Sequence, residues 1–173
     1  MNTHVKSRKL LNRVQTLSKA ISSVSTGIGA GLMGLMFVSI VLAVIFRYVL
    51  LNPLPWTDEV AIYCNIWIGF LGIGVAIKTD SHPYMEFIMK KFSKKVQRIV
   101  ALFVDLLVLA FFVVVTIWGF RYALTSGKIR TSYSLGISMQ LPMLAVPIGA
   151  LLAVLQVCLR NIERFLEGEL DAR

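Results

Sequence analysis

The chain has 173 residues and a formal net charge of +9, with 57% hydrophobic and 16% charged residues. A soluble domain holds about 45–50% apolar and about 25% charged residues, so this composition excludes an ordinary soluble globular domain. Because roughly 20 apolar residues in a helix cross a hydrocarbon core of about 30 Å, the long apolar blocks predict a multispanning helical membrane protein. The positive charge does not indicate a nucleic-acid partner, since the basic residues flank these blocks.

The apolar blocks predict an all-α membrane protein in which residues 1–173 form a single membrane domain. Four transmembrane helices are expected at about 24–51, 57–77, 99–122 and 138–159. In the first span, Gly27 and Gly31 have the small-residue spacing that lets two membrane helices approach closely. In the fourth span, Pro147 removes a backbone hydrogen bond and predicts a kink.

Two further segments, residues 1–23 and 78–98, predict amphipathic helices that lie in the membrane interface and bind phospholipid. Each places apolar side chains at helical spacing beside a basic face. The apolar positions are Leu10, Val14, Leu17 and Ile21 in the first segment, and Met85, Ile88, Met89 and Phe92 in the second. For residues 1–23 the alternative is a partly ordered basic tail that only sets topology.

The distribution of basic residues predicts the orientation in the membrane. Most of the 18 Lys and Arg residues lie before the first span, between the second and third spans, or after the fourth. Cytoplasmic loops carry an excess of such residues. Both termini and the middle connection are therefore expected in the cytoplasm, and the turn at 52–56 and the loop at 123–137 are expected to face outward.

Arg47, Glu59 and Asp105 are the informative charges of the spans, because a charge in hydrocarbon is costly and normally pairs or faces protein or water. Arg47 lies near the end of the first span and Glu59 near the start of the second, so their depths are similar. This favours an Arg47–Glu59 pair. The alternatives are contact with a second protein and a coupling-ion site. Asp105 is expected to meet Lys78, Arg98 or a group on a partner.

The start of the second span concentrates polar and aromatic residues. Thr57 is predicted to be the helix N-cap. Asp58 and Glu59 follow in the first turn, where the helix dipole favours negative charge. Trp56 stands where an interfacial aromatic belt would place it.

The sequence predicts neither an enzyme nor a bound cofactor or metal. His4 lies in the N-terminal tail and His82 in the middle connection, so two histidines cannot hold a haem inside the bundle. Metal-ligand spacings, nucleotide-binding loops and nucleophile triads are also missing from the sequence.

Several motifs around the first two spans follow the pattern of a known family. They are Phe46-Arg47-Tyr48, Pro53, Pro55-Trp56-Thr57-Asp58-Glu59, Trp67, Phe70-Leu71-Gly72, Lys78 and His82, with a second patch at Pro147-Ile148-Gly149 and Leu152. With them, nearly the whole chain resembles the DctQ family, the small membrane subunits of tripartite ATP-independent periplasmic (TRAP) transporters. Pro83 departs from the pattern, because the family more often has an apolar residue there. Glu86 stands where an acid is usual.

The resemblance implies a non-catalytic scaffold subunit in the bacterial inner membrane. In such systems a periplasmic binding protein captures an organic acid, and a large membrane subunit carries it inward on a sodium gradient. Family members serve C4-dicarboxylates, sialic acids and other organic acids, and specificity lies in the other subunits. The alternatives are a self-contained small homo-oligomeric transporter and an assembly or sensory membrane protein outside transport.

On this view two sets of residues are candidates for function. Those expected to be structural or to lie at a subunit interface are Arg47, Trp56, Asp58, Glu59, Trp67, His82 and Asp105. Arg47, Trp56 and Glu59 would stabilise the outer end of the scaffold. Lys128 and Arg130, in the outward loop, are candidate contacts for the binding protein.

Overall fold

The computed structural model describes residues 2–79 and 94–171. Its elements are α1 (Asn2–Val44), the π-helix η1 (Ile45–Val49), α2 (Pro55–Lys78), α4 (Lys94–Ile129) and α5 (Gln140–Asp171). Four stretches of described helix are long and apolar enough to cross a membrane, which confirms the predicted all-α fold with four spans. The second predicted interfacial helix, with His82, Pro83 and Glu86, lies for the most part outside the described residues.

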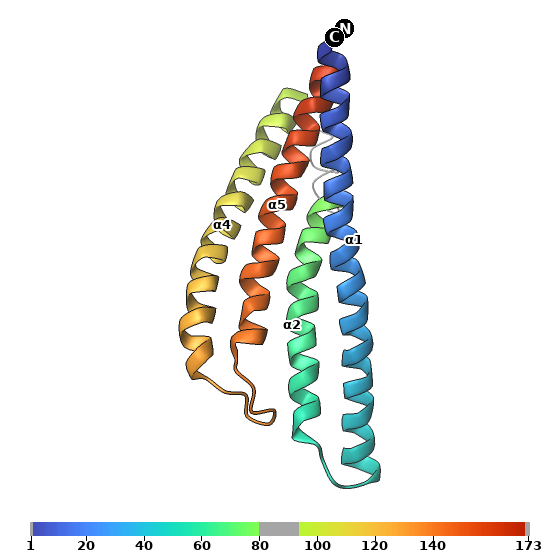
Figure 1. Ribbon diagram of the computed structural model, residues 1–173, viewed down its shortest axis with the longest axis vertical. Coiled ribbons are helices and arrows are strands. Elements are labelled where there is room, and N and C mark those ends of the chain that lie inside the picture. Colours follow the sequence, from blue (N-terminus) through green and yellow to red (C-terminus); the bar gives the residue numbers. More distant parts are fainter. Residues whose placement is uncertain (1, 80–93, 172–173) are drawn as a thin grey trace.

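The four long helices lie side by side, with α5 between α4 and α2, and α1 along the other side of α2 (Figure 1). Both chain termini lie at one end, and the α1–α2 and α4–α5 connections lie at the opposite end. In its most apolar window, α5 has 44% of its residues buried, whereas α1 and α4 have 6% each. The bundle is therefore built around α5, and α1 and α4 form two open flanks.

Small residues set the close approach of α5 to its neighbours. A Cβ atom added at Gly149 would lie 2.5 Å from Cβ of Phe70 on α2, so only glycine allows this crossing. On the other side of α5, Pro147 packs against Gly119 of α4, where an added Cβ would lie 3.1 Å from the proline Cβ. These contacts make α5 the common partner of α2 and α4.

The glycines of the first span have a different environment. A Cβ atom added at Gly27, Gly31 or Gly34 would meet nothing within 4 Å. The face that the glycine spacing marks for helix packing is therefore open in the single chain.

The helices continue past three of the predicted boundaries. Residues 1–23 were expected to form a separate arm, but α1 is unbroken from Asn2 to Val44, because residues 20–26 contain neither Gly nor Pro. At about 1.5 Å per residue, α1 is about 65 Å long, roughly twice the thickness of the hydrocarbon core. The first half of the predicted outward loop is helical, since α4 continues to Ile129. Helix α5 likewise continues beyond the predicted end of the fourth span, to Asp171.

A pair of buried polar side chains joins α1 to α5 near the end that carries the termini. The Ser18 hydroxyl donates to Oε1 of Gln156 at 2.9 Å, and Nε2 of Gln156 donates to the Ser18 carbonyl at 3.1 Å. Both residues are buried. The N-terminal half of α1 is thus held against the bundle at this point.

Candidate functional site

The connection between α1 and α2 places Asp58 and Glu59 at the start of the second span. Leu54 is the N-cap and Pro55 is the first helical residue, a position that suits proline because its missing N–H would be unpaired there anyway. Thr57 is therefore the third residue of the helix, and the prediction that it is the N-cap is wrong. Its buried hydroxyl donates instead to the Leu54 carbonyl at 2.6 Å.

Asp58 binds Arg47 across this connection. Arg47 lies in η1, and its Nη2 is 2.6 Å from Oδ2 of Asp58. The two side chains are 49% and 53% exposed, so water screens the pair. The predicted Arg47–Glu59 pair is wrong, because consecutive helical residues point about 100° apart and Asp58 is the acid that faces η1.

Glu59 points instead to the connection between α4 and α5. Its carboxylate accepts a hydrogen bond from the Ser132 hydroxyl. It also accepts hydrogen bonds from the backbone N–H groups of Tyr133 at 2.9 Å, and of Ser134 and Leu135 at 3.2 Å each. One carboxylate thus ties the start of the second span to a connection more than 70 residues away, an arrangement that the sequence did not predict.

The connection that Glu59 holds, residues 130–139, is a compact turn. The Ser132 N–H donates to the Ile137 carbonyl at 2.8 Å, and the Met139 N–H donates to the Arg130 carbonyl at 2.9 Å. Gly136 has a φ of +64°, which glycine adopts without strain. The turn therefore has a fixed shape although it connects two helix ends.

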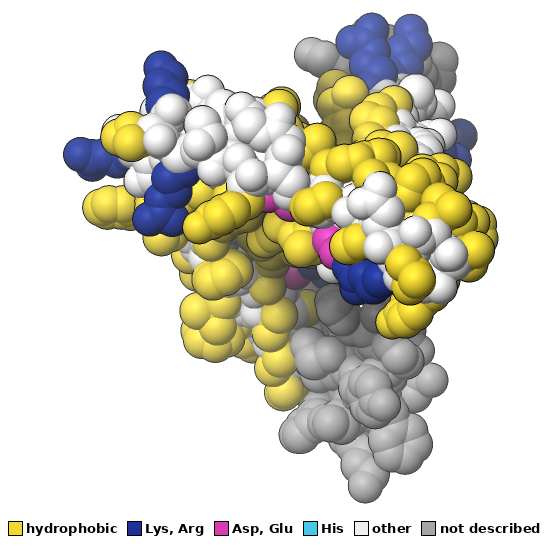
Figure 2. Space-filling view, turned by 90° about the horizontal axis from the view of Figure 1, so that it is seen from below, with side chains coloured by type: hydrophobic (Ala, Val, Ile, Leu, Met, Phe, Trp, Pro, Cys, Tyr) yellow, Lys and Arg dark blue, Asp and Glu magenta, His cyan; other side chains and the backbone are white. Residues whose placement is uncertain are grey.

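The candidate contact residues lie on or beside this turn. Lys128, Arg130 and Tyr133 are exposed. Of the two tryptophans named as candidates, Trp56 is exposed and Trp67 is half-buried. In the view onto this end, Lys and Arg side chains project from the margin, whereas Asp and Glu show only in small areas between the helices (Figure 2).

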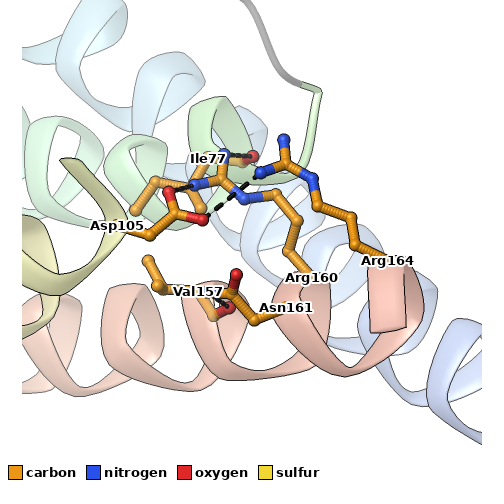
Figure 3. A network of polar contacts seen from close by, with 6 residues as sticks. All are labelled: Ile77, Asp105, Val157, Arg160, Asn161 and Arg164. Carbon is orange, nitrogen blue, oxygen red and sulfur yellow. Dashed lines mark hydrogen bonds and ion pairs between the residues drawn. The ribbon is translucent and has the colours of Figure 1, made fainter. Parts of the chain in front are cut away.

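The second charged cluster lies toward the other end of the bundle, around Asp105 of α4 (Figure 3). The buried carboxylate forms ion pairs with Arg160 and, at 3.3 Å, with Arg164, both on α5. Nη1 of Arg160 also donates to the Ile77 carbonyl near the end of α2, at 3.2 Å. The expectation that Asp105 meets Lys78 is wrong, because α4 packs on α5 and the continued helix α5 supplies the arginines. The side chain of Arg98 lies outside the part of the chain that the structure describes.

The cluster joins α4 to α5 through ion pairs and α5 to α2 through a hydrogen bond, and it leaves the carboxylate with little solvent access. Within residues 2–79 and 94–171, no three His, Cys, Asp or Glu side chains gather closely enough to hold a metal ion. The arrangement can neutralise charge and fix helix positions, which are structural tasks.

A comparison with protein families decides what kind of protein carries these features. The family "Tripartite ATP-independent periplasmic transporters, DctQ component" matches residues 36–167. The chain belongs to this family. It is therefore a multi-pass membrane protein and the small permease subunit of a TRAP transporter. The matched range includes the acidic pair, the turn and the Asp105 cluster, but not the N-terminal 35 residues.

Two curated relatives of this DctQ protein are similar in sequence. The sialic acid TRAP transporter small permease protein SiaQ of Vibrio cholerae serotype O1 is 23% identical over 141 residues, which cover 82% of this chain and 81% of SiaQ. The sialic acid TRAP transporter permease protein SiaT of Haemophilus influenzae is 29% identical over 90 residues. That match covers 52% of this chain but only 15% of SiaT, so this chain spans a small part of the larger relative.

Proposed function

We propose that this DctQ subunit is a non-catalytic scaffold in a sodium-driven transporter that imports an organic acid. Its partners are a large membrane subunit, which carries the substrate and couples sodium, and a periplasmic binding protein. It resides in the bacterial inner membrane with both termini in the cytoplasm, as the distribution of basic residues favours. Both curated relatives are named as sialic acid transporter proteins, so sialic acid is the first substrate to test and a C4-dicarboxylate is the second.

The observation that carries this proposal is the charge arrangement of the bundle. The charged groups described above join helices and connections of this chain to one another. Asp105 binds two arginines of α5, Asp58 binds Arg47, and Glu59 binds the turn. A translocation path needs polar groups that a substrate or ion can reach. Groups that bind one another fit a fixed support better than a path.

The open flanks support a large membrane partner. Helix α1 exposes a face with Gly27, Gly31 and Gly34, where another helix can approach closely. The match to SiaT favours the same conclusion, because a segment similar to this chain occupies a small part of a much larger permease. When a relative carries the similar segment and the rest of the permease in one chain, the two parts are expected to function side by side.

Lys128 and Arg130 are proposed contacts for the binding protein. They are exposed at the end of the bundle opposite the basic N-terminal segment. The excess of basic residues in cytoplasmic segments favours an outward position for this end. Reversing both charges, with Lys128→Glu and Arg130→Glu, is expected to weaken docking and to lower uptake at limiting binding protein.

Reconstitution tests the proposal directly. The chain, the large subunit of its transporter and the purified binding protein are combined in proteoliposomes with an inward sodium gradient, and entry of labelled sialic acid or succinate is followed. Uptake is expected only with all three proteins and the gradient. Uptake by vesicles that contain this chain alone would contradict the proposal and favour a self-contained homo-oligomeric transporter.

A further inference from the structure

We propose that the turn at residues 130–139 is a preformed docking element in which Tyr133 is the anchor and Glu59 the positioning residue. The occupant is a soluble protein whose docking face has an apolar pocket with an acidic rim. This inference rests on the proposed function and names the chemistry by which the transporter's binding protein is recognised.

Tyr133 has the properties of an interface anchor. Its relative exposure is 104%, and that of Ile129, the last residue of α4, is 84%, so two large side chains are exposed on and beside the turn. Tyrosine and arginine are enriched among residues that dominate binding energy, and Arg130 lies between these two. Because the turn backbone already has a fixed shape, ordering the exposed tyrosine side chain on binding has little entropic cost.

The aromatic residues of α4 favour a position of the turn outside the hydrocarbon, which argues against lipid as the occupant. Trp118 and Tyr122 are exposed on α4 where an interfacial aromatic belt is expected, and Arg121 lies over the Trp118 ring at 5.6 Å from its centroid. From Tyr122 to Ile129 the helix rises about 10 Å. The turn beyond it therefore faces water and soluble partners.

The charge at this end favours an acidic partner. Asp58 and Glu59 are the acids among residues 44–60 and 121–140, and both already bind groups of this chain. In the described part of the chain, Lys128 and Arg130 have no ion pair of their own. The outward end thus presents positive charge around Tyr133, and complementary charge steers docking.

Glu59 fixes the position of this anchor through the backbone. It accepts the N–H of Tyr133 itself and those of the next two residues. The Ser132 hydroxyl, which also donates to Glu59, accepts the Leu135 N–H at 3.1 Å. The carboxylate therefore acts on docking by holding the turn and not by touching the partner.

Binding of the transporter's own soluble binding protein to the small and large subunits in lipid nanodiscs tests this inference. Tyr133→Ala is expected to reduce the affinity by about tenfold or more, while the large subunit still co-purifies. Glu59→Gln is expected to give a smaller loss. Because Glu59 acts through the turn, the double variant should bind no more weakly than Tyr133→Ala alone. Tyr48→Ala, which removes an exposed tyrosine at the other outward connection, is the matched control and should bind like the unaltered complex.

The outcomes separate the inference from the proposed function. If the complex of unaltered small and large subunits does not bind the binding protein, the proposed docking role of this subunit is contradicted. An unaltered complex that binds, together with equal binding by Tyr133→Ala, would overturn only the anchor. Loss of the large subunit from Tyr133→Ala would show that the turn is covered by that subunit instead. Additive losses in the double variant would show that Glu59 does not act through Tyr133.

Discussion

Asp105 and Glu59 each join helices that are far apart in the sequence, but different groups bind the two carboxylates. Asp105, with a side chain 7% exposed, binds two guanidinium groups from α5. Glu59, at the end of the bundle opposite the chain termini, binds one hydroxyl and three backbone N–H groups of a turn. Charged partners fix the position of whole helices, whereas backbone donors fix the shape of a connection. The Asp105 site is suited to hold the bundle together, and the Glu59 site is suited to present a surface.

The energetic consequences of the two arrangements also differ. A buried ion pair adds little net stability, because desolvation offsets the attraction, but removal of one partner leaves an uncompensated charge in a medium of low dielectric constant. At the opposite end, where the Arg47 and Asp58 side chains are about half exposed, water can replace a lost contact. Substitutions at the Asp105 site should therefore act on assembly and stability, and those at the Glu59 site should act on local shape and docking.

The largest effect is expected from Asp105→Ala. It leaves Arg160, a side chain only 15% exposed, without its carboxylate, and breaking a buried pair in this way costs about 3–5 kcal/mol. The midpoint of thermal unfolding of the purified subunit in detergent should fall accordingly. Replacing Asp105 together with the more buried of its two arginine partners, with Asp105→Leu and Arg160→Met, should recover much of the loss. An unchanged midpoint for Asp105→Ala would mean that this cluster does not hold α4 to α5.

An intermediate effect is expected from Gly149→Ala, which changes no charge. The new methyl group would lie 2.5 Å from Cβ of Phe70 and 2.6 Å from the Phe70 carbonyl oxygen, so α2 and α5 must separate. Overpacking of this kind costs about 1–3 kcal/mol, measured by the same thermal unfolding. Gly72→Ala is the control on α2, because its added methyl meets nothing within 4 Å. Equal midpoints for the two variants would contradict the close crossing.

The smallest effect is expected from the Arg47–Asp58 pair. Because both side chains are about half exposed, the coupling energy from a double-mutant cycle of Arg47→Gln and Asp58→Asn should be about 1 kcal/mol or less. It should shrink further in high salt, since exposed charges are screened. A coupling of the size expected at Asp105 would show that the α1–α2 connection is as strongly fixed as the Asp105 cluster.

The four spans could be predicted from the sequence because their signal is local. Each apolar block is long enough to cross the hydrocarbon by itself, and the confirmed fold follows from block length and order. The turn predicted at Asn52–Trp56 was marked by its two prolines, but only its first three residues lie in the connection, because α2 begins at Pro55. The helix ends could not be predicted from the apolar blocks, because polar residues end a helix only where a cap or turn competes with it. Helix α4, for example, continues beyond the predicted span to Ile129.

The partners of the charged residues could not be predicted, since they depend on which helices pack together. Arg160 lies just beyond the predicted end of the fourth span, and only the continuation of α5 and its packing on α4 bring it to Asp105, 55 residues away. Glu59 was matched in depth to Arg47, but depth does not specify the direction of a side chain. The one-residue difference between Asp58 and Glu59 decides which connection each acid reaches.

Co-purification from native membranes tests the central claim that this chain is a scaffold subunit. The tagged chain is extracted in mild detergent, and the proteins that remain bound are identified by mass spectrometry. A large multispanning permease in a fixed ratio to this chain is the predicted result, and its sequence would indicate the substrate class. A homo-oligomer of this chain with no other membrane protein bound would contradict the account.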